Sequence, residues 1–321
     1  MIDLQALLEN YLPPEIRDAL QFFPPEEQTK IREIRLRRRR VSTATLSVEN
    51  VVLREKGTGK PILLTDEEIQ RTFLLVCENS IYKYENEIKQ GYITLKNGCR
   101  VGFCGSRYEN GMLKDISSMN IRISKSVFEA SKEIFPSIYE NGTIISTLIV
   151  SPPCGGKTTL LGDIARKLSD ECKKRCAIVD ERGEIAAAHR GVPQKEVGQL
   201  SDVLDGYPKG IGMMIALRCL SPQALICDEV GTEEDAAAMM QAMNAGVPVI
   251  ASAHAENEIQ LMSRPQIRSL MDGGAIEQVI FLEGAAHPGK FKKRVRARDL
   301  YENSGRDFDY SQRSVGHKKL C

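Results

Sequence analysis

The segment TLIVSPPCGGKTTLLGDIARKL constrains the fold of this chain more than any other part of its sequence. A short β-branched run at Thr147–Val150 leads into Ser151–Thr158, and a helical stretch follows directly. A loop that ends in Gly-Gly-Lys-Thr between a strand and a helix is typical of a phosphate-binding loop. Such a unit belongs in a sheet whose strands alternate with helices, so the segment predicts an α/β fold.

Each part of this loop has a predicted task. The glycines let backbone N–H groups approach a phosphate, because no Cβ is in the way. Lys157 would reach the β- and γ-phosphates of ATP, and the Thr158 hydroxyl would bind Mg²⁺. The residues expected to contact the nucleotide are Ser151, Pro152, Pro153, Cys154, Gly155, Gly156, Lys157, Thr158 and Thr159.

The loop departs from the usual pattern at its first position, where Ser151 replaces glycine. If that position requires a positive φ, serine costs roughly 1–2 kcal/mol there. Alternatively, the chain enters the loop by a route that serine tolerates. The sequence leaves both readings open, so nucleotide binding is better supported than a normal rate of hydrolysis.

A second feature is an acidic pair, Asp228 and Glu229, which directly follows the apolar run Leu225–Cys227. The carboxyl ends of parallel strands meet at one edge of the sheet, so these acids are expected beside the phosphate-binding loop. Asp228 is predicted to hold Mg²⁺, through water, and Glu229 to orient or deprotonate the attacking water. An acidic pair of this kind favours hydrolysis over transfer to a bound acceptor.

Two further strands are predicted to end in polar side chains at the same edge. Cys176–Val179 runs into Asp180-Glu-Arg-Gly-Glu184, which is either the start of a helix with solvated acids or a second acidic group near the nucleotide. In the latter case Glu184 or Glu181 would lie near the attacking water. The run Val249–Ala251 ends in Ser-Ala-His254, and His254 is expected to hydrogen-bond the γ-phosphate.

The distribution of apolar runs predicts the domain organisation. From residue 143 to 301 the chain reads as a P-loop NTPase core with a mostly parallel sheet flanked by helices. Residues 1–125 read as a smaller α+β N-terminal domain, 126–142 as a helical connector, and 302–321 as a basic, disordered tail. The strand-like runs are Ile144–Val150, Cys176–Val179, Leu225–Cys227, Pro248–Ala251 and Val279–Leu282; the helical ones are Lys157–Leu168, Tyr207–Leu220 and Thr232–Ala245.

Composition excludes several classes of protein. The formal net charge is +1 and only 6% of residues are aromatic, which argues against tracking along nucleic acid. No apolar run approaches the ~20 residues that cross a bilayer, so a cytoplasmic protein is expected, peripheral to a membrane through its partners. The nine cysteines contain no CxxC pair and are read as small, buried, reduced side chains rather than metal ligands. The arginine-rich tract Arg32–Arg40 is either a solvated face or a surface for a partner or acidic lipid.

The order of these motifs resembles the secretion-type, AAA-like ATPases that power type II and type IV secretion and pilus machines. The resemblance is closest to the stage III sporulation protein AA family of endospore-forming bacteria, and it extends to the N-terminal segments RLRRRR, ITLKNGCRVGFCG and LKDISSMNIRIS. It implies that Lys157 and Thr158 take the phosphate and Mg²⁺ positions and Asp228–Glu229 the second acidic motif. It also implies that Glu184 is the last acid of the first acidic motif. His254 corresponds to the histidine of the family's histidine motif.

The resemblance further implies a ring, usually a hexamer, in which the N-terminal domain of one subunit closes over the nucleotide of its neighbour. Arg100, Arg107 and Arg122 are then candidates for an arginine that acts in trans on the γ-phosphate. The function implied is an Mg²⁺-dependent ATPase that drives a secretion-like membrane channel in endospore formation, docked on membrane-embedded components. A nucleotide-switched assembly scaffold with slow hydrolysis and a nucleic-acid motor are the alternatives.

Overall fold

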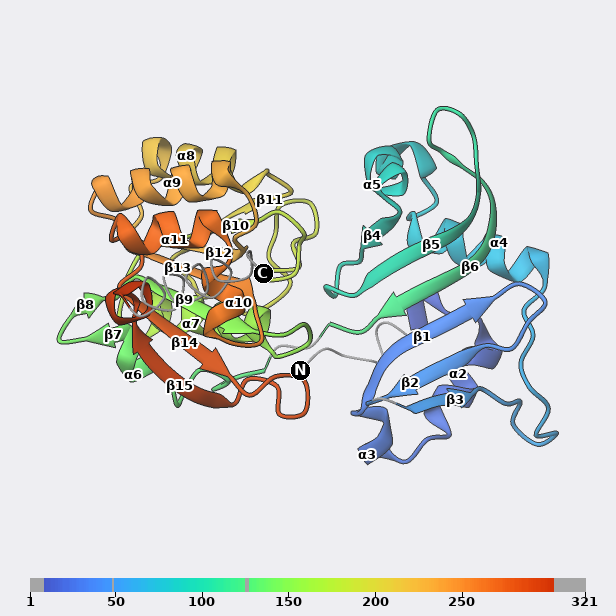
Figure 1. The fold of residues 1–321 in the computed structure, drawn as a ribbon. Coiled ribbons are helices and arrows are strands. Elements are labelled where there is room, and N and C mark those ends of the chain that lie inside the picture. Colours follow the sequence, from blue (N-terminus) through green and yellow to red (C-terminus); the bar gives the residue numbers. More distant parts are fainter. Residues whose placement is uncertain (1–8, 48, 125–126, 303–321) are drawn as a thin grey trace, which may run out of the picture. The chain divides into compact units, whose positions relative to one another are not determined.

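The chain folds into two compact units, Met1–Ser126 and Val127–Cys321, which are described separately (Figure 1). The computed structural model describes residues 9–47, 49–124 and 127–302. The predicted basic tail, 302–321, therefore lies outside the described residues except for Glu302.

The first unit contains a six-stranded antiparallel sheet. Asn-Gly turns lie between β4 and β5 and between β5 and β6, where Gly98 and Gly111 have φ values of 75° and 85°. In spatial order the strands are β3 (Glu49–Val52), β2 (Thr43–Leu46), β1 (Ile31–Arg37), β6 (Leu113–Arg122), β5 (Arg100–Arg107) and β4 (Tyr92–Thr94).

Helices cover one face of this sheet. Apolar residues of α2, α4 and α5 share a core with inward-facing strand residues such as Ile34 and Ile121. One helix begins at Asp66, because Thr65 and Glu68 form a capping box, and it ends at Val76. The helices are α2 (Pro14–Gln21), α3 (Pro25–Gln28), α4 (Asp66–Val76), the 3₁₀ turn η1 (Ile81–Tyr84) and α5 (Glu85–Gln90).

The arginine-rich tract forms strand β1 as far as Arg37. Ile34 and Leu36 point into the core, whereas Arg35 lies on the opposite face, paired with Thr43 on β2 and Asn120 on β6. Residues paired across a sheet share a face, so the same face also carries Arg122 and, opposite it on β5, Arg100. This face of the sheet is polar and basic.

The second unit is the predicted α/β core, and its fold is that of a P-loop NTPase. Its seven-stranded sheet is parallel except for the last pair, β14 and β15. The spatial order is β11 (Ser201–Asp205), β10 (Cys176–Asp180), β12 (Ala224–Glu229), β13 (Val249–His254), β9 (Thr147–Ser151), β14 (Gln278–Leu282) and β15 (Phe291–Arg296).

Both faces of this sheet are covered by helices, as the near-continuous apolar strands predicted (Figure 1). Alternate strand residues such as Ile149 and Ile250 pack against α7 on one face. Their neighbours, such as Val150 and Ala251, pack with the helices of the other face. The helices are α7 (Lys157–Asp170) on the first face and α8 (Lys209–Cys219), α9 (Glu233–Asn244), α10 (Glu258–Met262) and α11 (Pro265–Asp272) on the second.

The helix expected over residues 125–141 is mostly absent. Within the described part of that stretch only α6 (Phe135–Ile138) is α-helical, and a two-stranded hairpin follows, β7 (Tyr139–Glu140) and β8 (Thr143–Ile144). Pro136 lacks an N–H group and therefore sits in the first turn of α6 instead of continuing an earlier helix. Ile134 and Ile138 are buried in the core beside α7.

The same stretch is fastened to α7 by a set of polar contacts that we call the α7 clamp: Glu129, Ser131, Asp163 and Lys167. Asp163 accepts hydrogen bonds from the N–H and the hydroxyl of Ser131 at 2.8 and 2.6 Å. Lys167 donates to Glu129 at 2.8 Å. Burial opposes the charge on Asp163, but Ser131 and Arg166 outweigh it and lower the pKa of Asp163.

The cysteines were predicted to be buried, and this is correct for only part of them. Cys77, Cys99, Cys176 and Cys227 are buried, whereas Cys104, Cys154 and Cys219 are exposed. All of the cysteines within residues 9–302 that the structure describes are free thiols. Within the same part of the chain, no helix combines the length and the apolar character needed to span a bilayer.

Candidate nucleotide-binding site

The phosphate-binding loop lies between β9 and α7, where the sequence placed it. β9 ends at Ser151, α7 begins at Lys157, and Gly156 is the residue that caps the helix. Gly156 supplies no side-chain acceptor, so the first N–H groups of α7 are left for another partner. A helix N-terminus with such free donors attracts phosphate oxygens.

Lys157 is held across the loop by the loop's own backbone. Its Nζ donates to the carbonyl oxygens of Ser151 and Pro152, both at 3.0 Å, and to the Ser151 hydroxyl at 3.1 Å. The side chain is buried, and burial lowers the pKa of Lys157 to about 8, although Glu229 and Cys154 oppose the shift. The ammonium group is therefore fixed in place before any phosphate arrives.

Of the two readings that the sequence left open for Ser151, the structure supports the second. Ser151 is the last residue of β9 and is not among the residues with positive φ, so serine is tolerated there. Cys154 instead has a φ of 61°. A non-glycine residue in this region costs roughly 1–2 kcal/mol, so the loop stores its strain at Cys154. The loop enters by the route that serine tolerates.

Position 155 must be glycine because a larger side chain there would collide with Ser151. A Cβ at position 155 would lie 2.2 Å from the Ser151 Oγ and 2.7 Å from its Cβ. Alanine at this position must therefore push the serine away from Lys157 or distort the loop. This dependence between two positions is not visible in a consensus pattern.

This contact makes a testable prediction. We expect Gly155→Ala to lower the free energy of unfolding by about 1–3 kcal/mol, because an extra methyl group is forced into a packed site. Adding Ser151→Gly should restore most of the loss, because it removes both atoms that the new Cβ meets most closely. Urea unfolding of the two single variants and the double variant measures this, and a double variant no more stable than Gly155→Ala would contradict it.

Gly156 is required for a different reason, which the sequence did not reveal. It has a φ of 87°, and a Cβ there would lie 2.6 Å from the backbone nitrogen of Gly289. Gly289 N–H donates to the Gly155 carbonyl at 2.9 Å. The turn between β14 and β15 is thus fastened to the back of the phosphate-binding loop.

Asp228 and Glu229 lie at the carboxyl end of β12, near the loop, as predicted. Ile226 pairs with Ile250 and Glu229 with Ser252, so β12 has one residue more than β13 between these pairs. Such an irregularity breaks the alternation of side chains along a strand. The side chains of two consecutive acids can therefore both lie at the same edge of the sheet.

Asp228 has the environment of a cation-binding carboxylate. Its side chain is buried. Its Oδ1 lies 3.3 Å from the ammonium of Lys209, and it accepts no hydrogen bond of good geometry from a described residue. Burial raises the pKa of Asp228 to about 6, with Asp180 and Glu184 acting in the same direction and Lys209 against them. A buried carboxylate oxygen of this kind, at the carboxyl end of β12, fits the requirement of Mg²⁺ for oxygen ligands.

The protein alone does not provide a complete metal site. Within residues 9–302, apart from the undescribed positions, no group of three or more histidine, cysteine, aspartate or glutamate side chains is placed to hold a metal ion. Mg²⁺ characteristically takes only one or two carboxylates and completes its shell with phosphates and water. The residues thus fit Mg²⁺ that arrives with a nucleotide, held by Asp228 and Thr158.

His254 connects Lys157 to Glu229. Its Nδ1 lies 2.9 Å from the Lys157 Nζ, and its Nε2 lies 3.5 Å from Glu229 Oε2. The three protons of the ammonium have four acceptors within reach, and a lysine ammonium can only donate. When Nδ1 is one of the acceptors used, the ring proton is on Nε2, facing Glu229. Glu229 also pairs with Arg182 at 3.5 Å. The predicted phosphate ligand and the predicted base are therefore joined through one imidazole.

The first acidic segment is not the start of a helix. Asp180 is fully buried and accepts hydrogen bonds from the backbone N–H groups of Glu184, Ile185 and Ala186 at 2.9, 3.1 and 2.8 Å. It thus shapes the loop that presents Glu184, which is partly exposed. Glu184 is close enough to Asp228 to raise the pKa of that residue. Glu181 instead pairs with Lys209.

The structure separates the three candidate arginines of the first unit. Arg107 donates to the backbone carbonyls of Gly111 and Lys89, so it holds a turn in place. Arg100 stacks over the Tyr92 ring at 3.5 Å. Arg122 is mostly exposed and faces Glu33 at 3.6 Å. Arg107 is thus bonded to the backbone of a turn and Arg100 is stacked on a ring, whereas Arg122 is exposed beside a glutamate.

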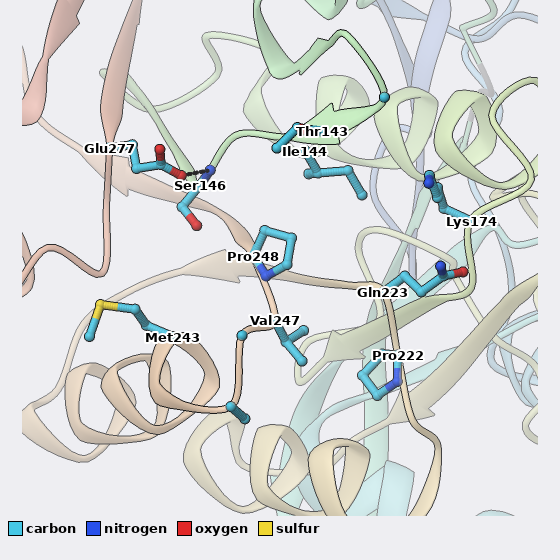
Figure 2. A pocket seen from close by; sticks show the side chains of 13 residues that line it. Thr143, Ile144, Ser146, Lys174, Pro222, Gln223, Met243, Val247, Pro248 and Glu277 are labelled. Atoms are coloured by element: carbon cyan, nitrogen blue, oxygen red, sulfur yellow. Dashed lines mark hydrogen bonds between the residues drawn. The ribbon is translucent and has the colours of Figure 1, made fainter.

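A separate pocket of about 600 Å³ lies at the opposite edge of the parallel sheet (Figure 2). Its wall includes residues that precede strands, such as Ser146 before β9 and Pro248 before β13. Figure 2 shows Glu277 bonded to the Ser146 N–H, at 3.0 Å. None of the predicted site residues lines this pocket. It is not part of the candidate site.

The sequence model of a family described as "Sporulation stage III, protein AA" matches residues 5–305. The chain belongs to the sporulation stage III protein AA family. It is similar to stage III sporulation protein AA of Bacillus subtilis (strain 168), with 39% identity over 287 residues, 87% of this chain and 91% of that protein. The resemblance inferred from the motifs is confirmed.

Solved structures place this family member in a wider fold group. The pilus retraction motor PilT with bound ADP matches with a TM-score of 0.56 and 13% identity, over 89% of this chain and 87% of that chain. The ATPase DotB of Yersinia pseudotuberculosis matches with a TM-score of 0.55 and 15% identity, over 90% and 84%. At these identities the likeness establishes a shared fold, which confirms the predicted P-loop ATPase fold.

Proposed function

We propose that this chain is an Mg²⁺-dependent ATPase and the motor of a secretion-like membrane channel in endospore formation. The observation that carries the proposal is the linked set Lys157–His254–Glu229. It joins a phosphate-binding cation to a carboxylate suited to activate water. A protein of the same fold is solved with bound ADP, and the family is one of sporulation stage III.

In this proposal the chain's own residues divide the work of hydrolysis. The N–H groups of the loop and Lys157 bind the phosphates, and Thr158 and Asp228 hold the Mg²⁺, which neutralises developing charge. Glu229 orients and deprotonates the attacking water, while Glu184 supports it from the adjoining loop. His254 would release Lys157 to the γ-phosphate and so report its presence to Glu229.

The motor is proposed to act as a hexameric ring that docks on membrane-embedded partners from the cytoplasm. The basic face of the first unit supplies Arg100 or Arg122 to the nucleotide of a neighbouring subunit. A guanidinium directed at the transferring phosphate is worth about 10³–10⁵ in rate in other phosphoryl-transfer enzymes. A ring that needs its neighbour would show little activity as a monomer.

The direct test measures phosphate release and molecular mass together. We expect the purified protein to release phosphate from ATP only when Mg²⁺ is present, and its mass to rise to that of a ring when ATP is added. Chelation by EDTA should reduce turnover to background, because Asp228 and Thr158 cannot supply the positive charge of the metal. The proposal is wrong if no Mg²⁺-dependent hydrolysis occurs even with the membrane partners present.

A further inference from the structure

A buried lysine that the sequence did not single out lies between the two acidic segments. Lys209 is the first residue of α8 and is 5% exposed. Its Nζ pairs with Glu181 Oε2 and lies 3.3 Å from Asp228 Oδ1. α8 follows β11, whose last residue, Asp205, pairs with Asp180 of β10. Lys209 therefore lies close to the carboxyl ends of these strands.

The charges at this edge make the position of Lys209 significant. Asp180 is compensated by the three backbone N–H groups that it accepts. Glu229 is compensated by Arg182 and approached by His254. The Oδ1 of Asp228 accepts no hydrogen bond of good geometry from a described residue, and the ammonium of Lys209, 3.3 Å away, faces that oxygen.

We propose that Lys209 is a built-in cation that takes the place of Mg²⁺ at Asp228 when no nucleotide is bound, and holds Asp228 and Glu181 together. A buried carboxylate without a counter-charge is strongly unfavourable. The side chain of Lys209 is flexible, so its ammonium can move away from Asp228 when Mg²⁺ enters with ATP and stay paired with Glu181. The assignment of Mg²⁺ to Asp228 rests on the proposed function, whereas the compensation of Asp228 by Lys209 stands without it.

The test removes this cation and asks whether Mg²⁺ replaces it in the absence of nucleotide. Without Mg²⁺ we expect Lys209→Met to lower the melting temperature by about 5 °C or more, because two buried or half-buried carboxylates lose their shared partner. About 10 mM MgCl₂ should restore at least half of that loss. About 30 mM NaCl, which has the same ionic strength, should restore much less, because it only screens. The wild-type melting temperature should not respond to Mg²⁺.

A matched control is available on α7. Lys167 is as buried as Lys209 and also pairs with a glutamate, Glu129, but at a distance from the acidic strand ends. Lys167→Met should lose stability without any specific response to Mg²⁺. If Lys209→Met does not fold, the double variant Lys209→Met/Asp228→Asn should fold, since the uncompensated charge is removed, and should not respond to Mg²⁺.

Three results would overturn the proposal. These are an unchanged melting temperature in Lys209→Met, a loss that Mg²⁺ does not restore, and a loss that NaCl restores equally well. The measurement uses no nucleotide, so it can succeed in a protein that does not hydrolyse ATP. Conversely, an active ATPase in which Mg²⁺ does not rescue Lys209→Met would contradict this inference alone.

Discussion

Replacing Lys157 by alanine is expected to lower the rate of ATP hydrolysis by about 10²–10³-fold, because a fixed donor aimed at the transferring phosphate is removed. ATP binding should weaken by about ten- to a hundredfold, the usual loss for a hydrogen bond to a charged group. The loop also loses three intramolecular bonds that Lys157 makes to Ser151 and Pro152, so its resting shape should relax.

The measurement is a titration with a fluorescent ATP analogue, together with phosphate release at saturating Mg-ATP. Lys167→Ala is the matched control, since it removes a lysine of the same helix that pairs with Glu129 instead of the loop. The control should bind and hydrolyse ATP almost as the wild type does. Equal losses in both variants would show that the effect comes from destabilising α7 and not from the phosphate site.

Replacing Glu229 by glutamine is expected to separate binding from hydrolysis. The amide keeps the size of the side chain but cannot accept a proton, so turnover should fall by about 10²–10⁴-fold. ATP affinity should stay within about threefold of wild type, because Glu229 is not one of the predicted phosphate ligands. The variant should therefore accumulate with ATP bound.

The control for this variant is Glu233→Gln at the exposed start of α9, which removes a nearby charge without touching Lys157 or His254. Unchanged turnover in Glu229→Gln would assign the base to another residue, with Glu184 as the next candidate. The same variants decide between a motor and a scaffold in cells. Spore formation that survives Glu229→Gln but fails with Lys157→Ala would favour the scaffold.

The parts of the fold that could be predicted are those with a strong local signal. The apolar runs of β9, β10, β12, β13 and β14 stand out because they are buried on both faces. The edge strands β11, with the sequence SDVLD, and β15, with FKKRVR, are polar and partly exposed, and they were missed for that reason. Strand β1 was missed because its exposed arginines hide the inward-facing Ile34 and Leu36.

The positions of the candidate site residues could be predicted, but the contacts between them could not. Motif spacing led to Lys157, Asp228 and His254 because each follows directly from a strand or loop signal. The contact between Gly289 and Gly155 and the contact between Lys209 and Asp228 join segments distant in the sequence. The crowding between Ser151 and a Cβ at position 155 is local, but it depends on how the loop folds. Such contacts are set by the packing of the whole unit, and a one-dimensional pattern contains no signal for them.

The α7 clamp has a mechanical consequence for the second unit. Ser131 and Glu129 lie only a few residues after the beginning of that unit, and both are bonded to the helix whose first turn carries Lys157 and Thr158. A pulling force applied to the chain at the start of the second unit would therefore reach α7 before it reaches any strand of the seven-stranded sheet. Under the proposed function α7 also binds the phosphates, so tension on the chain and the state of the nucleotide would act on the same helix.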